Sequence, residues 1–173
     1  GKVELLVGTS SVTNAEDLTS PLGFWRLGEA AGTATVQDQL GSISGTVNGT
    51  VTFNQTGPTA ITDGNKAATF DGSTGYINFG NPNSLPSGSM PFSLCAWAKT
   101  ATTAAGWRQI VSFGTASSSQ GIYLGMNGTT LYGTGFTNDL NVANYWSVGV
   151  WNHLCVVYDG ANASIYSNGD RKS

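Results

Sequence analysis

The chain has 173 residues, a formal net charge of −3, and only 10 % charged residues. This length suits one domain with a sizeable core, and a hydrophobic content of 39 % argues against a disordered chain. The seven basic residues are scattered, so no basic stripe exists to neutralise a nucleic-acid backbone. No apolar run approaches the roughly 20 residues of a membrane span. Abundant glycine favours a turn-rich β-sandwich over a helical protein.

The first 21 residues are interpreted as an arm, and residues 22–173 as the domain. Residues 2–7 (KVELLV) are a short apolar strand candidate. A polar linker follows, and residues 14–18 predict one capped helical turn that Pro21 ends. The chain has no signal peptide and begins at Gly1 rather than at methionine, which we interpret as a processed N-terminus or a fragment of a larger protein.

The stretch at residues 67–80 (AATFDGSTGYINFG) predicts a strand, a tight turn and a second strand, arranged like a hairpin. Ala68 and Phe70 alternate with Thr69, which is the period of a half-buried strand. Residues 71–75 form a polar, glycine-containing turn, and residues 76–79 are again rich in β-formers.

Further strand candidates recur roughly every eight to twelve residues, with turn signals between them. They lie at residues 23–28, 44–47, 51–53, 92–99, 107–113, 121–126, 129–132, 151–159 and 163–166. Asn127 and Gly128 predict a hairpin turn, whereas residues 138–144 predict a polar loop. No amphipathic helical run of useful length is present. The pattern therefore predicts an all-β sandwich or jelly roll.

The segment at residues 92–99 predicts a central strand, because both of its faces are mainly apolar. One face carries Phe92, Leu94, Ala96 and Ala98, and the other carries Cys95 and Trp97. We expect the two layers of the sandwich to share one interior that contains Phe70, Leu94 and Val156.

The two cysteines, Cys95 and Cys155, each lie in an apolar strand-like run. One interpretation is that they are small buried core residues. The alternative is a cross-strand disulfide, formed if the two runs pair in one sheet. Neither cysteine has a CxxC neighbour, which argues against a metal or redox role.

Three stretches together resemble the laminin-G-like jelly rolls of the concanavalin A-like lectin and glucanase superfamily. They are GFWRLGEAAGT at residues 23–33 followed by Asp38, AATFDGSTGYINFG at 67–80, and WNHLCVVYDGANASIYSNG at 151–169 preceded by FSLCAWAK. In that family an F-D-G turn, an F-S-x-x-x-W strand, a W-x-H-x-x-x-x-Y-D-G segment and a strand ending in N-G follow in this order. The resemblance implies an antiparallel jelly-roll β-sandwich from about Leu22 onward. The W-R-L-G-E segment is similar to modules of bacteriophage tail and fibre proteins and of bacterial surface proteins.

The resemblance also implies strands that this chain lacks. The family continues past the N-G turn with further strands, including an I-D-E-type motif that closes the sheets, whereas this chain ends at Ser173. An open sheet edge is normally avoided. We therefore expect either a longer polypeptide or another segment in the gap. Residues 2–7 are the candidate, in their own chain or donated to a neighbour by strand addition.

No catalytic site is expected. Glycoside hydrolysis needs two carboxylates across a sugar bond, but Glu4, Glu16 and Glu29 all precede the main sandwich, and no E-x-D-x-x-E is present. His153 is the only histidine, and the W-x-H pattern is structural in the family. A Ser-His-Asp site has no specific support.

Calcium is a further hypothesis, because related jelly rolls often hold the ion at a loop rim. The oxygen-bearing candidates are Asp38, Asp71, Asn138, Asp139 and Asp159. Asp71 and Asp159 are interpreted first as caps of tight turns. Asp139 with Asn138 and Asn141 is the candidate cluster for a metal or another ligand.

Sugar binding needs aromatic faces for stacking and amide or carboxylate partners for hydrogen bonds. The candidates are Trp107, Arg108, Tyr132, Phe136, Asn138, Asp139, Asn141, Asn144, Tyr145 and Trp146. The alternative is that the aromatic residues belong to the core. The leading hypothesis is thus a non-catalytic recognition or adhesion module, outside the cell or on a virion, that binds glycans or surface proteins. The second is a structural subunit of a fibre, filament or capsid decoration assembled by β-strand exchange, with residues 2–7 in a neighbour's sheet.

Overall fold

The computed structural model describes residues 5–8, 21–41, 43–59, 66–115, 117–118, 120–135 and 138–173, and the elements formed there are β-strands. No helix in these ranges has the length and apolarity to cross a membrane. The strands are β1 (Leu5–Gly8), β2 (Pro21–Trp25), β3 (Thr35–Val36), β4 (Gly45–Asn48), β5 (Val51–Thr56), β6 (Lys66–Phe70), β7 (Tyr76–Asn78), β8 (Phe92–Ala98), β9 (Trp107–Gly114), β10 (Gly121–Asn127), β11 (Thr130–Gly135), β12 (Asn138–Val142), β13 (Asn152–Tyr158), β14 (Ala163–Ser167) and β15 (Asp170–Arg171).

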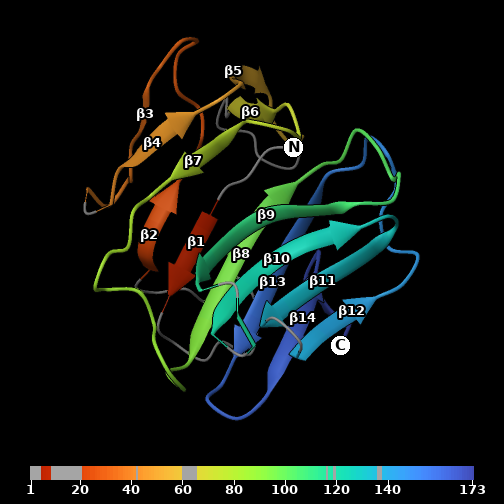
Figure 1. Ribbon diagram of the computed structural model, residues 1–173. Coiled ribbons are helices and arrows are strands. Elements are labelled where there is room, and N and C mark those ends of the chain that lie inside the picture. The colour runs from red at the N-terminus through yellow and green to blue at the C-terminus, as the bar shows by residue number, and fades with distance from the viewer. Residues whose placement is uncertain are drawn as a thin grey trace.

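The strands form a sandwich whose strand pairs are all antiparallel (Figure 1). One layer is a six-stranded sheet in the order β15-β14-β13-β8-β1-β2. The four-stranded sheet β12-β11-β10-β9 lies over one part of it, and the three-stranded sheet β3-β4-β7 lies toward its other end, beside the pair β5-β6. The predicted all-β antiparallel fold class is confirmed.

One hydrophobic core lies between the layers. Leu94, Val156 and Ile165 of the six-stranded sheet are fully buried and belong to the same cluster as Leu124 and Leu131 of the four-stranded sheet. Phe70 is partly buried and packs against this cluster, so the predicted shared interior is confirmed. Alternation along β8 also holds, because Phe92, Leu94, Ala96 and Ala98 face the core.

Gly133 of β11 sets how closely the two layers approach. A Cβ at this position would lie 2.5 Å from Cγ2 of Val156 and 3.1 Å from Cδ1 of Ile165. These separations are too short for carbon atoms, so the bare backbone of β11 rests directly on β13 and β14. A side chain at position 133 would therefore push the two sheets apart at this point.

The outer face of β8 and β13 carries a disulfide. Cys95 and Cys155 stand opposite each other in the ladder, with 4.1 Å between their Cα atoms, and their sulfurs are bonded. Both cysteines are buried, as expected, but they are not unlinked core residues. The cross-strand alternative is the correct one, because the two runs are direct neighbours in one sheet.

The arm contributes a strand to its own chain. Residues Leu5–Gly8 form β1 between β8 and β2, with Leu6 opposite both Cys95 and Phe24. This is the same-chain placement of the arm, while donation of the strand to a neighbour stays a prediction. The rest of the predicted arm strand, residues 2–4, and the predicted helical turn at 14–18 lie outside the described residues.

The hairpin predicted at residues 67–80 does not form, although both of its strands do. Strand β6 pairs with β5, and β7 pairs with β4, so the two strands belong to different sheets. The turn between β6 and β7 packs on the turn between β4 and β5, where Asp71 N donates to Thr50 O at 3.3 Å. Gly75 permits this contact, because a Cβ there would lie 2.2 Å from Thr50 O. The packing of the two turns therefore places β6 beside β5 and β7 beside β4, instead of pairing β6 with β7.

Two other boundaries differ from the prediction. The first domain strand ends at Trp25 rather than at Gly28, since Leu27 has a φ of 54°, a left-handed conformation that ends extended structure. The polar loop predicted at residues 138–144 is wrong for its first five residues, which form β12. Leu140 and Val142 of β12 pack against the core and anchor the strand.

Removing the disulfide is expected to destabilise the fold. Cys95 and Cys155 close a loop with a sequence separation of 60, and such a cross-link restricts the unfolded chain. Replacing both cysteines by alanine should lower the free energy of unfolding by about 4 kcal/mol, as measured by urea denaturation. Adding a thiol reductant to the variant is the control and should change nothing. A variant as stable as the oxidised wild type would contradict the prediction.

Candidate functional site

The outer face of the four-stranded sheet gathers aromatic and amide side chains from strands that are distant in sequence. Side chains alternate along each strand, so residues that pair across the sheet share a face. Tyr132 stands opposite Gly125 on one side and Asn141 on the other, and Gly125 stands opposite Gln109. We call this surface the aromatic face. It comprises Trp107, Gln109 and Ser112 of β9, Tyr123 and Gly125 of β10, Tyr132 of β11, and Asp139 and Asn141 of β12.

Trp107 is the most exposed large side chain of this face, with 58 % of its surface accessible. Its ring centroid lies 4.7 Å from that of Tyr132 and 6.2 Å from that of Tyr123. Such tilted and edge-to-face contacts stabilise aromatic clusters. The indole is therefore fixed from one side while much of its surface remains open to solvent.

Tyr123 is the buried member of the aromatic cluster with Trp107 and Tyr132. Its side chain is buried, and this burial raises the pKa of the phenol above its ordinary value, with a hydrogen bond to Asp139 and the negative charge of Asp139 acting in the same direction. The phenol therefore stays protonated and donates to the carboxylate. Within the described part of the chain, Oδ1 of Asp139 is buried and has no hydrogen-bond partner.

The middle of the aromatic face is a bare strip of backbone at Gly125. The register of β9 and β10 shifts next to this residue, which is the mark of a β-bulge. A Cβ on Gly125 would lie 2.6 Å from Arg108 O and 3.3 Å from the Cα of Gln109, so a side chain does not fit. The space beside Gly125 is therefore occupied by the backbone of β9.

Four of the predicted binding residues meet on this face: Trp107, Tyr132, Asp139 and Asn141. Tyr123 was missed, because it lies in the apolar run GIYLGMN and only the register of β10 reveals its neighbours. The one signal in the sequence is period-two alternation, which separates Tyr123 from the inward-facing Leu124.

The other predicted binding residues lie elsewhere. Arg108 is opposite the buried Met126, on the other face of β9, and its Nη1 donates to Ala104 O at 2.9 Å and to Gly106 O at 3.1 Å. Asn144 is in a turn with a φ of 53°. The Tyr145 hydroxyl pairs with Ser167 and its half-buried ring packs against the core, and Trp146 is buried in that core. Phe136 lies outside the described residues.

The calcium candidates are not assembled into a cage. Alternation along β12 places Asn138 on the face opposite to Asp139 and Asn141, which splits the predicted cluster. Asp38 is buried and accepts backbone N–H bonds from Phe24 and Leu40 at Oδ1 and from Ile43 at Oδ2. Its carboxylate is thus used to tie β2 to the following loop.

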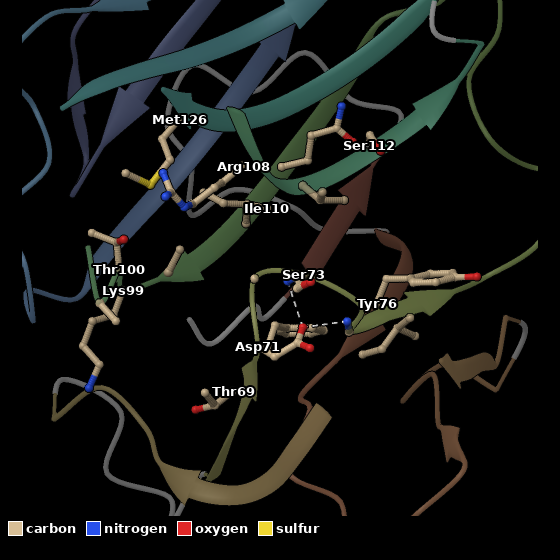
Figure 2. Close-up of a pocket in the computed structure, with 18 of the residues that line it drawn as sticks. Thr69, Asp71, Ser73, Tyr76, Lys99, Thr100, Arg108, Ile110, Ser112 and Met126 are labelled. Atoms are coloured by element: carbon tan, nitrogen blue, oxygen red, sulfur yellow. Dashed lines mark hydrogen bonds between the residues drawn. The ribbon is translucent and has the colours of Figure 1, made fainter. Parts of the chain in front are cut away.

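Asp71 and Asp159 both cap turns. Oδ1 of Asp71 accepts from the backbone N–H groups of Ser73, Thr74 and Gly75, as Figure 2 shows in part. Oδ1 of Asp159 accepts from the backbone N–H groups of Ala161 and Asn162, and these bonds lower the pKa of the carboxyl. The turn-cap interpretation agrees with both geometries.

His153 lies on the same outer face as the disulfide. Its ring centroid is 5.2 Å from that of Trp97, and its backbone N–H donates to Oδ1 of Asn168. Ligand atoms of Cys95, His153 and Cys155 lie within 4.8 Å of one another, but the two sulfurs are bonded to each other. This arrangement is a packed structural cluster.

A groove runs beside the aromatic face, between β9 and β7. Its larger stretch has a volume of about 740 Å³. In Figure 2, Arg108, Ile110 and Ser112 lie on one side of it and Asp71 and Tyr76 on the other. A second stretch of about 560 Å³ continues it along the same two strands. We call the two stretches together the edge groove.

Comparison with known proteins identifies a family for this chain. A model of the family Laminin_G_3, of the concanavalin A-like lectin/glucanases superfamily, matches residues 71–173, which is more than half of the sequence. The match includes β7 to β15 and all residues of the aromatic face. No curated protein and no solved structure matched the chain.

Asp71 is expected to make stability depend on pH. Backbone N–H donors, first those of Ser73 and Gly75, hold the pKa of Asp71 well below its ordinary value. A depressed folded pKa means that the stabilisation is fully present above the unfolded pKa of about 3.9 and is lost as the pH falls through the folded value. Asp71→Asn should therefore lower the free energy of unfolding at neutral pH.

The difference between wild type and Asp71→Asn should shrink below about pH 4, as measured by urea denaturation across the acid range. Asp170→Asn, at an exposed carboxylate in β15, is the matched control and should show little effect. A difference that stays constant or grows in acid would contradict the assignment.

Proposed function

We propose, since the chain belongs to the concanavalin A-like lectin/glucanases superfamily, that it is a non-catalytic recognition module that binds glycans through the aromatic face. A superfamily of lectins and glucanases suggests a carbohydrate ligand. The single observation that carries the proposal is the exposed indole of Trp107, held in place by Tyr123 and Tyr132 on the surface of a sheet.

The chemistry of the face suits a sugar ring. A pyranose has apolar C–H faces that stack on an indole and a rim of hydroxyls that need hydrogen-bond partners. Trp107 supplies the stacking surface, and the exposed side chains of Gln109 and Asn141 supply amide donors and acceptors. Because these groups lie on strands, they are positioned before the ligand arrives, which lowers the entropic cost of binding.

Binding without hydrolysis is the mode we propose. Cleavage of a glycosidic bond needs two carboxylates on either side of it. Among the described residues, Asp139 is the one carboxylate of the aromatic face, while Asp71 and Asp159 are held by their own turns. A lone carboxylate beside a stacking platform favours recognition.

The cellular setting that we propose is the surface of a cell or a virion. The disulfide between Cys95 and Cys155 and the laminin-G-like family together indicate a secreted or extracellular protein. A low content of charged side chains with a net charge of −3 is compatible with an exposed adhesion domain.

Trp107→Ala is expected to weaken glycan binding by roughly tenfold or more, because the stacking platform is lost. Binding is measured first on a glycan array and then by titration with the best sugar, with calcium and with a chelator. Tyr132→Ala should weaken binding to a smaller extent, since this ring positions Trp107 rather than presenting the largest surface.

The matched control is Tyr76→Ala, which removes another exposed aromatic ring, from β7 and outside the aromatic face. Its binding should equal that of wild type. An array without binding in either condition, or a Trp107→Ala variant with unchanged affinity, would overturn the proposal. Glycan binding that is lost in the chelator would indicate that a calcium ion takes part in ligand binding.

A further inference from the structure

The second layer of the sandwich is interrupted by two strand edges that face each other. In the described part of the chain, β9 pairs with β10 alone, and β7 pairs with β4 alone. Figure 1 shows β7 and β9 as the neighbouring margins of the two smaller sheets, with β9 in front of β8 and β7 near the end of β2. An unpaired strand edge presents a row of backbone N–H and C=O groups.

The edge groove occupies the interval between these margins. Both of its stretches are lined by the same part of β7, Tyr76 and Ile77, and by consecutive residues of β9, with Val111 and Ser112 common to both. Trp25 of β2 also lines both stretches, and Leu94 of β8 lines the second. The floor is therefore the apolar inner face of the six-stranded sheet, and the described residues place no strand of the second layer over it between β7 and β9.

Only one kind of ligand matches two opposed strand edges. Each wall offers alternating partial positive and partial negative charge from its N–H and C=O groups. An extended polypeptide carries the same alternation on both of its sides, and its side chains point alternately to the floor and to solvent. A sugar, a nucleotide or a helix matches at most one wall. The complementarity thus selects an extended strand with apolar residues at every second position.

Side-chain charge indicates how such a strand is oriented. Asp71, Lys99 and Arg108 all line the larger stretch, whereas the second stretch contains no charged side chain. The carboxylate of Asp71 is already bound by three backbone N–H groups of its own turn. Two cations and one carboxylate leave an excess of positive charge at this end, and an acidic side chain of the incoming strand is complementary to it. Nη1 of Arg108 contacts neutral carbonyls of Ala104 and Gly106, and Nζ of Lys99 lies over the ring of Trp151, so both side chains keep their charge.

We propose that the edge groove accepts one extended strand from a separate polypeptide and that this strand joins β7 to β9 in one continuous sheet. The partner is an apolar, alternating segment with an acidic residue at the end next to Lys99 and Arg108. This binding mode is strand addition on both sides of the ligand. It does not depend on glycan binding, because it uses the edges of the sheets rather than the aromatic face.

The test uses a pool of synthetic octapeptides in which valine, isoleucine, leucine or phenylalanine alternates with threonine and glutamate stands at one end. The matched control pool has the same side chains with N-methyl groups on alternate backbone nitrogens, which removes strand donors. We expect peptides to bind and their N-methylated forms to bind at least tenfold more weakly. Backbone amides of β7 and β9 should exchange with deuterium more slowly when the peptide is present.

A filled groove should exclude the peptide. Val111→Trp directs an indole into the edge groove, where open space receives it, so we expect unchanged or raised stability and at least tenfold weaker peptide binding. Thr52→Trp adds the same ring at an exposed position of β5 outside the groove and should bind peptide like wild type. Tyr132→Ala, which impairs only the aromatic face, should also bind peptide normally.

Three results would overturn the proposal. One is the absence of binding by any peptide of the pool at millimolar concentration. Another is equal binding of the N-methylated pool, or unchanged amide exchange in β7 and β9. The third is a dimer of the chain alone, detected by light scattering and abolished by Val111→Trp, which would assign the groove to a second copy instead of a separate partner.

Discussion

The ladder between β8 and β13 is the constraint on which the rest of the structure depends. Strand β8 is apolar on both faces, so it needs cover on each side: the inner face meets the four-stranded sheet, and the outer face is closed by the disulfide. Once Leu94 and Val156 are fixed in the core, the inward residues of β10 and β11 must meet them. Because side chains alternate along a strand, the residues between these inward-facing ones must point to solvent. The aromatic face is therefore a consequence of the burial of the opposite face of the same sheet.

Strand β9 belongs to both proposed binding surfaces. Its outer face carries Trp107 and Gln109, while its free edge forms one wall of the edge groove. The two surfaces use different groups of the same strand, side chains in one case and backbone in the other.

Much of the fold could be predicted from the sequence because the signals were local. The run around Leu94, apolar on both faces, identified a central strand, and Asn127 with Gly128 marked the hairpin between β10 and β11. Strand β12 was missed because asparagine and aspartate are typical of loops, although Leu140 and Val142 kept the period of a strand. The hairpin at residues 67–80 was mispredicted for a different reason: which strand pairs with which depends on contacts between two turns. Likewise, the aromatic face was only half predicted, because register decides that Tyr123 lies under Trp107.

Gly133 has a consequence for how this fold can change during evolution. The layers touch there with no side chain on β11, and the volume is supplied entirely by Val156 and Ile165. A larger residue at position 133 is therefore compatible with the same spacing only if one of the two facing residues becomes smaller. In related sequences, a larger side chain at one of these three positions should be accompanied by a smaller one at another. The total side-chain volume at this contact should stay nearly constant.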